Sequence, residues 1–452
     1  MPSMRATSDR PSVPAIKRLL RADDLAAVSE QVEGLRPRQA ISLLERLPQR
    51  ERALVFRMLP KPLAIDVFDG LDNPLQADLV HALQGEEVAD VFARLDPEDR
   101  VGLLDELPAV VASRLVRALP EQERTRTSAV LGYPPRSIGR RMSAQIITVR
   151  PDHTAEEALE RMRRNLDSAE TVYTLLVTDD ERRLVGALRL RDLLAADPAE
   201  RVEGMLHSTE AVEVGESAEL AARRCADHRL LALPIVDAEG RAVGILSVDD
   251  ALAILEEAES EDAARSGGSE PLRRPYLSTP VRRLVTSRVV WLFVLAIGAS
   301  LTVQVLERFE DTIAQMVVLS VFIPLLIGTG GNTGNQAATT VTRALALGDV
   351  TPRDILAVLA REARTGVSLG IIIGAAGFGV AALVYGVPIG LVVGLTLLCI
   401  CSLAASIGGI MPLIAKRIRV DPAVFSNPFI TTFVDAAGLI VYFLIARAVL
   451  GL

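Results

Sequence analysis

A single carboxylate lies near the middle of a long segment that carries no other charge. Asp435 is almost midway between Asp421 and Arg447, the nearest charged residues on either side. An ionisable group at the centre of a bilayer costs about 2.5–3.5 kcal/mol on insertion scales, so it is expected to have a function. Asn427, Thr431 and Asp435 are spaced at intervals of four, which places them on one helix face. An ion pair or a protonated carboxyl group is the structural alternative.

A second polar segment, GTGGNTGNQAATT, lies within another uncharged stretch. We expect its glycines to allow close backbone approach and to expose carbonyl oxygens to an aqueous path, because irregular backbone at membrane depth must line water or be buried in protein. Small-residue helix packing is the alternative, and it explains the glycines but not the amides. The candidate path-lining residues are Gly328, Gly331, Asn332, Thr333, Asn335 and Gln336.

Long uncharged segments must carry these residues. Residues 312–342 would form a helix of about 46 Å, longer than the ~30 Å hydrocarbon core, so this segment must be kinked or extend beyond it. Residues 365–415 are long enough for two spans, divided at 385–390. We therefore predict a five-helix transmembrane domain over residues 287–452, with spans at 289–306, within 312–342, twice within 365–415, and between 421 and 447.

Basic residues give this domain an orientation. In a five-span arrangement only Arg308 and Arg447 fall on one side, and ten basic residues fall on the other. The positive-inside rule then places the N-terminus in the cytoplasm and the C-terminus outside. The first external loop, Glu307–Asp311, is acidic and would attract cations. The ten basic residues are Arg282, Arg283, Arg288, Arg343, Arg353, Arg361, Arg364, Lys416, Arg417 and Arg419.

Residues 1–286 have the opposite composition. They contain 39 basic and 49 acidic residues, against 10 and 8 in the remainder of the 452-residue chain. An acidic excess argues against nucleic acid as a partner and favours cations. Three cysteines and four scattered histidines have no zinc or disulfide spacing, so a bound metal should be a hard ion with oxygen ligands, such as Mg2+. No nucleotide-hydrolysing motif is present, and we predict no enzyme activity.

Leucine recurs at every twelfth position in the N-terminal region, from Leu47 to Leu119. This spacing accommodates one short helix and a turn, and Pro48, Pro60, Pro97 and Pro120 mark helix boundaries. We predict an all-α superhelical solenoid over residues 15–132 that serves for docking. Its acidic helix surfaces could also contribute ion ligands. The acids concerned are Glu86, Glu87, Asp96, Glu98, Asp99, Asp105 and Glu106.

A second repeat follows, in which Val185-Gly186 is matched by Val243-Gly244. Both copies read strand, helix, hairpin, strand and helix. This pattern resembles a tandem pair of α/β CBS domains, at residues 138–194 and 202–258. The resemblance implies sensing of adenosine nucleotides or ions, with Arg191 and Asp192 at a position where ATP could bind. Capping of the following helix is an equal alternative for the aspartate.

An acidic segment connects this pair to the membrane. Residues 259–286 begin as a helical pattern and loosen at Ser266-Gly267-Gly268. Such a segment is usually a solvated face or a linker, but it could also transmit a conformational state to the pore.

Two motifs of the membrane domain, together with the order of the domains, resemble the MgtE family of magnesium channels and transporters. GTGGNTGNQAAT and RVDPAVFSNPFITTFVDAAGLIVYF carry the resemblance, and the order of domains agrees. It implies a homodimer in the cell membrane with a central pore that conducts Mg2+ inward. Asp435 would be the pore carboxylate, with the Thr431 carbonyl one turn earlier and Asn332 and Asn335 opposite. Mg2+ retains several waters in protein sites, which suits outer-sphere binding. Glu362 would lie near the exit, or pair with neighbouring arginines.

The resemblance also implies closure of the pore by cytosolic Mg2+. Glu219, Asp250, Glu261 and Asp262 match the acidic interface of the family, and Glu257 and Glu259 are nearby candidates by composition. Ala253 stands where the family pattern has an acid. Two other functions remain open: a proton- or sodium-coupled carrier, and a membrane-anchored ion or nucleotide sensor whose spans only dimerise. Expected partners are a second copy of the chain and membrane lipid.

Overall fold

Short helices at regular intervals form the N-terminal part of the computed structural model, which describes residues 13–22, 24–83, 86–272, 274–418 and 427–452. Eight successive helices, α3 to α10, begin at residues 37, 49, 61, 73, 86, 97, 109 and 121. The repeated leucines are all buried. The predicted alternation of helix and turn is thus present. The helices are α1 Val13–Arg21, α2 Leu25–Glu33, α3 Pro37–Glu45, α4 Gln49–Arg57, α5 Lys61–Asp69, α6 Asn73–Ala82, α7 Glu86–Phe92, α8 Pro97–Glu106, α9 Ala109–Ala118 and α10 Glu121–Leu131.

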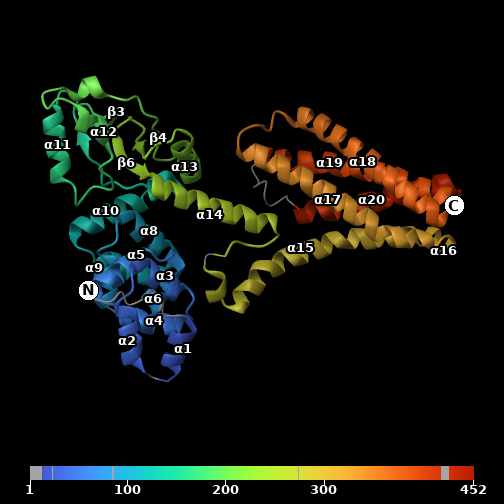
Figure 1. Cartoon of the computed structure of the whole chain (residues 1–452), viewed down its shortest axis with the longest axis horizontal. Coiled ribbons are helices and arrows are strands. Elements are labelled where there is room, and N and C mark those ends of the chain that lie inside the picture. Colours follow the sequence, from blue (N-terminus) through green and yellow to red (C-terminus); the bar gives the residue numbers. More distant parts are fainter. Residues whose placement is uncertain (1–12, 23, 84–85, 273, 419–426) are drawn as a thin grey trace, which may run out of the picture. The chain divides into compact units, whose positions relative to one another are not determined.

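These helices pack mainly against the helix two positions further along the chain. Helices α2, α4, α6, α8 and α10 make one row of contacts, and α3 with α5 and α7 with α9 pack in the same way. Figure 1 shows the stack at the blue end of the chain. The superhelical winding remains a prediction.

On every second helix, a buried side chain donates a hydrogen bond to a carbonyl near the end of the preceding helix. Arg52 Nε donates to the Leu44 carbonyl at 2.9 Å, Gln76 Nε2 to Phe68 at 2.7 Å, and Arg100 Nε to Phe92 at 3.0 Å. The donors lie on α4, α6 and α8, and each binds a carbonyl at or near the end of α3, α5 or α7. The Leu44 and Phe68 carbonyls also accept from the amides of Leu47 and Leu71. The structural repeat is therefore a pair of helices, a period that the leucine spacing did not reveal.

Two three-stranded sheets follow, each covered by helices. In the first, β1 Thr148–Val149 pairs parallel to β2 Thr174–Thr178, which pairs antiparallel to β3 Leu184–Arg189. β4 Val212–Glu213, β5 Ala232–Val236 and β6 Ala242–Ser247 repeat this order. The irregularities in β2 and β5 lie at equivalent positions of the two copies, so the predicted duplication is present. The helices and turns are η1 Ile138–Arg140, α11 Ala155–Arg164, α12 Leu190–Ala195, η2 Val202–Met205 and α13 Ala218–Asp227.

Helix α14, Val248–Ser266, continues from the second sheet into the predicted linker. The chain divides into two compact units, of which one holds residues up to 258 together with 273–279, and the other holds 259–272 and 280–452. The short turn η3, Tyr276–Ser278, belongs to the first unit although it directly precedes the long apolar helices.

Long helices build the second unit: α15 Val281–Arg308, α17 Val318–Ala346, α18 Ile355–Tyr385, α19 Val387–Arg417 and α20 Asn427–Leu450, with the short α16 Glu310–Gln315. Among the described residues, four helices are long and apolar enough to cross a membrane, namely α15, α18, α19 and α20. The predicted second span coincides with α17, whose polar residues 328–340 reduce its hydropathy. Five spans therefore remain a prediction, whereas four are supported.

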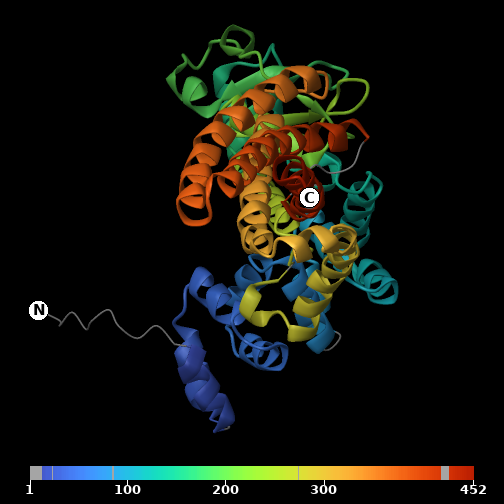
Figure 2. The ribbon, with the colours of Figure 1, turned by 90° about the vertical axis from the view of Figure 1, so that its right-hand side faces the viewer.

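Close helix packing defines the core of this unit. α19 packs against α17, α18 and α20, and Figures 1 and 2 show these helices lying together. The predicted break at residues 385–390 is present, because Gly386 separates α18 from α19. Its φ of 92° lies in the left-handed region, which glycine adopts without a steric penalty.

Candidate functional site

One polar contact joins the two segments that the sequence singled out. The Thr431 hydroxyl of α20 donates to Asn335 Oδ1 of α17 at 3.4 Å. Asp435 lies one helical turn further along α20 and is half-buried. Its Oδ1 atom is buried and has no hydrogen-bond partner within the part of the chain that the structure describes. A carboxylate oxygen in this condition is costly unless a ligand, water or proton satisfies it.

The glycines of α17 serve close packing. A Cβ atom on Gly330 would lie 2.6 Å from Ile400 Cγ2, and one on Gly334 would lie 2.8 Å from Ile430 Cγ2. A Cβ on Gly331 would lie 3.0 Å from Thr431 Cγ2. Helix α17 is also continuous from Val318 to Ala346. The prediction of irregular backbone with exposed carbonyls is therefore wrong, because carbonyls within a continuous helix are paired with amides of the same helix.

The remaining polar residues of α17 separate into two faces. Gly328, Asn332 and Gln336, at intervals of four, are exposed on one face of the helix. Thr333 is buried, donates to the Thr329 carbonyl at 2.8 Å and lies 3.8 Å from Cys401 Sγ of α19. Its predicted pore-lining role is corrected to helix packing. Asn427 begins α20, and its side chain lies outside the described residues.

Glu362 packs against α19 near the start of α18. A Cβ atom on Gly409 would approach Glu362 Cγ to 2.6 Å, so the glycine leaves room for the glutamate stem. The carboxylate is half-buried. Nearby Arg364 donates its Nε to the Ala360 carbonyl rather than to this group.

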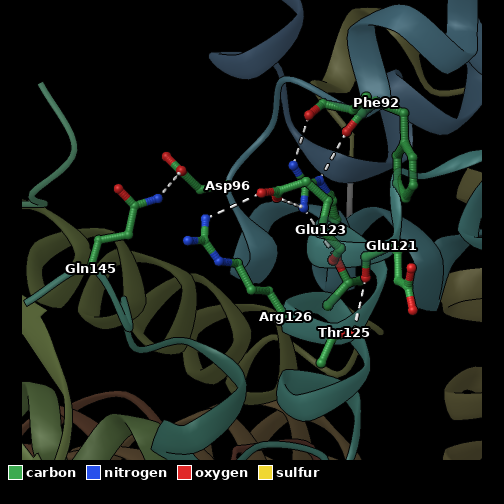
Figure 3. Close-up of polar contacts among 10 residues, drawn as sticks. Phe92, Asp96, Glu121, Glu123, Thr125, Arg126 and Gln145 are labelled. Atoms are coloured by element: carbon green, nitrogen blue, oxygen red, sulfur yellow. Dashed lines mark hydrogen bonds and ion pairs between the residues drawn. The ribbon is translucent and has the colours of Figure 1, made fainter.

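Acidic residues of the helical domain face acidic residues of the duplicated domain. The charges of Asp69, Asp96, Asp250 and Glu170 all act on Asp99. We call the following set the acidic surface: Asp69 of α5, Asp96, Glu98 and Asp99 at the start of α8, Glu170 after α11, and Asp250 of α14. Gln145 Nε2 contacts Asp96 across the same boundary at 2.5 Å, and Figure 3 shows this pair.

The environment of the acidic surface disfavours negative charge. Burial, with added repulsion from neighbouring carboxylates, raises the pKa of Glu98 to about 8 and that of Asp99 to about 7. The Asp99 side chain remains solvent-exposed, so water weakens its shift more than that of half-buried Glu98. Burial also raises the pKa of Asp250 and Glu170. A cation bound here would favour the charged forms.

Asp250 also has a structural role. Ser247 donates its hydroxyl to Asp250 Oδ2 at 2.6 Å and accepts from the Asp250 amide at 3.3 Å. Ser247 thereby caps the start of α14, and the Asp250 carboxylate accepts from the capping hydroxyl.

Several other predicted regulatory acids have arginine partners. Glu219 pairs with Arg223 at 2.8 Å, Glu257 pairs with Arg141 at 3.1 Å, and Glu261 pairs with Arg265. Glu259 and Asp262 are exposed. Within the described residues, no three His, Cys, Asp or Glu side chains are grouped closely enough to hold a metal ion. A regulatory ion at these positions would have to be hydrated or accompanied by movement of the side chains.

The predicted nucleotide residues lie beside a histidine. Asp192 Oδ2 is 2.8 Å from His207 Nε2, and Arg191 is largely exposed near the same carboxylate. An exposed guanidinium is suited to phosphate.

The sequence analysis did not identify three acids that lie where the helical domain meets the duplicated domain: Asp69, Asp72 and Glu170. Asp72 is affected by the charges of Glu256 and Glu257 on α14. It follows the repeated Leu71 as Asp96 follows Leu95, so the position after the leucine could have indicated it. Glu170 lies in a loop after α11, where no pattern distinguishes it.

Comparison with known families assigns all three regions of the chain. Residues 35–136 match the MgtE intracellular N domain, residues 136–199 and 201–257 match the CBS domain, and residues 323–445 match MgtE, described as a divalent cation transporter.

Whole proteins with the same arrangement are also similar. The magnesium transporter MgtE of Thermus thermophilus is 37% identical over 341 residues, which cover 75% of each chain. The magnesium transporter MgtE of Enterococcus faecalis is 29% identical over 70% of each chain. A solved structure of the cytosolic domain of the Mg2+ channel MgtE in complex with ATP is 32% identical, covers 54% of this chain and 100% of its own, and has a TM-score of 0.49.

Proposed function

The chain belongs to the MgtE family of divalent cation transporters, and from this premise we propose that it carries Mg2+ into the cell along a path formed by α17 and α20. It is a transporter and not an enzyme; inosine-5'-monophosphate dehydrogenases match only 113 residues, through their CBS domains. The proposed location is the cell membrane, with the N-terminus in the cytoplasm and the C-terminus outside.

The buried Asp435 oxygen, for which the described residues provide no partner, is the observation that carries this proposal. Mg2+ gives up its water reluctantly. Its hydration shell can donate hydrogen bonds to the carboxylate and to amide oxygens of Asn332 and Asn335. It can also donate to the Thr431 carbonyl, whose oxygen has a second lone pair besides the one used in helix α20. A negative carboxylate at this depth also excludes anions. Gly328 and Gln336 would extend the path along the exposed face of α17, with Asn427 and Glu362 as further candidates.

Replacement of Asp435 tests the path. We expect Asp435→Ala to abolish Mg2+ uptake by cells that lack other importers, because the attraction for the hydrated cation is lost. Asp349→Ala, which removes an exposed carboxylate between α17 and α18, is the matched control and should retain most uptake. Both variants must reach the membrane at equal levels.

Equal uptake by wild type and Asp435→Ala would reject the path. A requirement for a proton or sodium gradient at fixed Mg2+ would instead identify a coupled carrier. A membrane-anchored sensor would show no uptake in any form while still responding to Mg2+ through its N-terminal domains.

We propose that the protein acts as a homodimer. Apolar side chains are exposed at duplicated positions of the CBS pair: Tyr173 corresponds to Leu231, and Leu194 corresponds to Leu252. Duplicated exposed apolar positions are suited to an interface between identical chains, in which the same patch is used on both sides.

We further propose that cytosolic Mg2+ closes the path by binding at the acidic surface, with Asp250 as one contributor. Glu219, Glu257, Glu259, Glu261 and Asp262 would contribute to additional sites on α13 and α14. The oxygen-only donor set suits Mg2+. The raised pKa of Glu98 supports this idea, because an uncompensated carboxylate gains more from a cation than a paired one does. ATP would modulate closure through Arg191 and Asp192.

A further inference from the structure

One side of α18 is exposed along much of the helix. The main packing partner of α18 is α19, and buried glycines such as Gly366 and Gly370 make the contact. The other side carries apolar side chains, of which Val367 is 42% exposed, Ile371 58% and Ile372 68%. An exposed apolar surface of this kind indicates contact with lipid or with another protein.

Two arginines continue this side toward the start of the helix. Arg361 and Arg364 are exposed, and their spacing places them on one face with Ser368 and Ile372. The uncharged residues 365–385 extend about 31 Å, which matches the ~30 Å hydrocarbon core. This length places both guanidinium groups at one boundary of the core, which is the cytoplasmic boundary in the proposed orientation.

The positive charge on this face has no carboxylate partner. Neither arginine forms an ion pair within the part of the chain that the structure describes. Arg364 donates its Nε to the Ala360 carbonyl at 3.0 Å, so its Nη atoms can bind a further acceptor. Glu362 lies against Gly409 of α19, on the packed side of the helix. An anion from outside the chain would therefore complete this face.

The combination of charge and apolar surface selects the kind of partner. A guanidinium group binds phosphate through parallel N–H donors. An anionic phospholipid presents its phosphate at the boundary of the core and its acyl chains beside the apolar residues. A second copy of the chain is less suited, because a two-fold contact through this face would bring the same arginines of both chains together.

We propose that this face of α18 is a binding site for an anionic phospholipid of the cytoplasmic leaflet. The headgroup phosphate accepts hydrogen bonds from Arg361 and Arg364, and the acyl chains cover Val367, Ile371 and Ile372. The bound lipid neutralises both arginines and holds the start of α18 at the membrane surface. The proposal rests on the proposed membrane location and orientation, and not on the transport of Mg2+.

Replacement of the two arginines tests the site. Arg361→Gln/Arg364→Gln removes both phosphate donors, and both side chains are exposed, so the helix is expected to remain folded. Arg361→Lys/Arg364→Lys retains the charge and is the conservative variant. Arg353→Gln removes an exposed arginine that precedes the first residue of α18, and it is the control for each arginine replaced singly.

Native mass spectrometry of the full-length protein, released from detergent, measures binding of added phosphatidylglycerol or phosphatidylcholine. Wild type should bind phosphatidylglycerol roughly tenfold more tightly than phosphatidylcholine, because only the former has a net negative charge. The double glutamine variant should lose this preference, the double lysine variant should retain part of it, and Arg353→Gln should match wild type. Excess inorganic phosphate should not displace the lipid, since the acyl chains contribute to binding.

An unchanged preference in the double glutamine variant, or an equal loss in Arg353→Gln, would overturn the site. Displacement by inorganic phosphate would show an anion site that does not require lipid, which also contradicts the proposal. If wild type binds no phosphatidylglycerol and the double glutamine variant changes the oligomeric state, the face belongs to a second copy of the chain. No ion flux is measured, so failure of the proposed Mg2+ uptake would leave each of these outcomes unchanged.

Discussion

At the scale of single residues, the carboxylate of Asp78 is held by two buried contacts, whereas Asp90 of the same domain has an exposed partner. Removing one partner of a buried ion pair leaves an uncompensated charge, which typically costs about 3–5 kcal/mol. Arg52 would be left in this condition, since its guanidinium is buried and cannot turn to solvent.

We therefore expect Asp78→Ala to destabilise the helical domain by about 3–5 kcal/mol. Slowly exchanging amides of α4 and α6 in the full-length protein measure this change as lost protection. Asp90→Ala, which removes the exposed partner of Lys61, should leave the same amides unchanged. Comparable losses in both variants would show that burial of the pair does not matter.

Asp435 and Asp78 differ in how visible they are in the sequence. A charge inside a long apolar segment is conspicuous, so Asp435 could be identified directly. Asp78 lies among many acids, and its partners are 26 and 196 residues away. Pairings at such separations depend on the tertiary fold, which local patterns do not encode.

At the scale of elements, helix contacts in the apolar unit are made at glycines. A Cβ atom on Gly374 of α18 would lie 2.7 Å from the Gly394 carbonyl of α19. Gly379 lies further along α18, and a Cβ atom there would meet nothing within 4 Å. Small residues let helices approach closely where no water drives their association.

Gly374→Ala should destabilise the α18–α19 contact by about 1–3 kcal/mol, as overpacking does. Gly379→Ala should be neutral or slightly stabilising, since alanine favours helix more than glycine does. The fraction of protein that stays monodisperse after heating in detergent reports both effects. Loss of stability in Gly379→Ala alone would contradict this packing.

The spacing of residues predicted where helices begin and end, but it did not predict what the glycines of α17 contact. The division at Gly386 and the regular succession of short helices could be predicted, because breakers and periodic leucines act locally. The role of Gly330, Gly331 and Gly334 in α17 was misinterpreted, since these glycines leave room for side chains of α19 and α20. Sequence alone does not say which neighbour a glycine faces.

At the scale of the whole molecule, part of the acidic excess of the N-terminal region gathers where the helical domain meets the CBS pair. The excess was visible in the composition, whereas the acids that form the acidic surface were only partly identified. Asp96, Glu98 and Asp99 lie in a charged repeat and could be named in advance; Glu170 required the fold.

The raised pKa of Glu98 predicts a pH dependence of stability. Between the ordinary glutamate pKa and about 8, the folded protein retains a proton that the unfolded chain releases, so stability falls as pH rises. In the absence of Mg2+, the urea midpoint of the N-terminal unit should be higher at about pH 6 than at about pH 9. Added Mg2+ should raise the midpoint most at the higher pH.

Glu98→Gln should remove much of this pH dependence, because the amide carries no charge at either pH. Glu121→Gln, at an exposed position of α10, is the control and should retain it. A midpoint that rises with pH in Mg2+-free protein would contradict the assignment.

The recurrence of Arg52, Gln76 and Arg100 on every second helix limits how this domain can change length during evolution. Gain or loss of a single helix would shift every later helix to the opposite row, so that a donor would face helix ends that have no need of it. Gain or loss of two helices would preserve each donor and its acceptor. Insertions and deletions in this domain are therefore expected in steps of one helix pair, and the even number of helices from α3 to α10 agrees with growth by duplicated pairs.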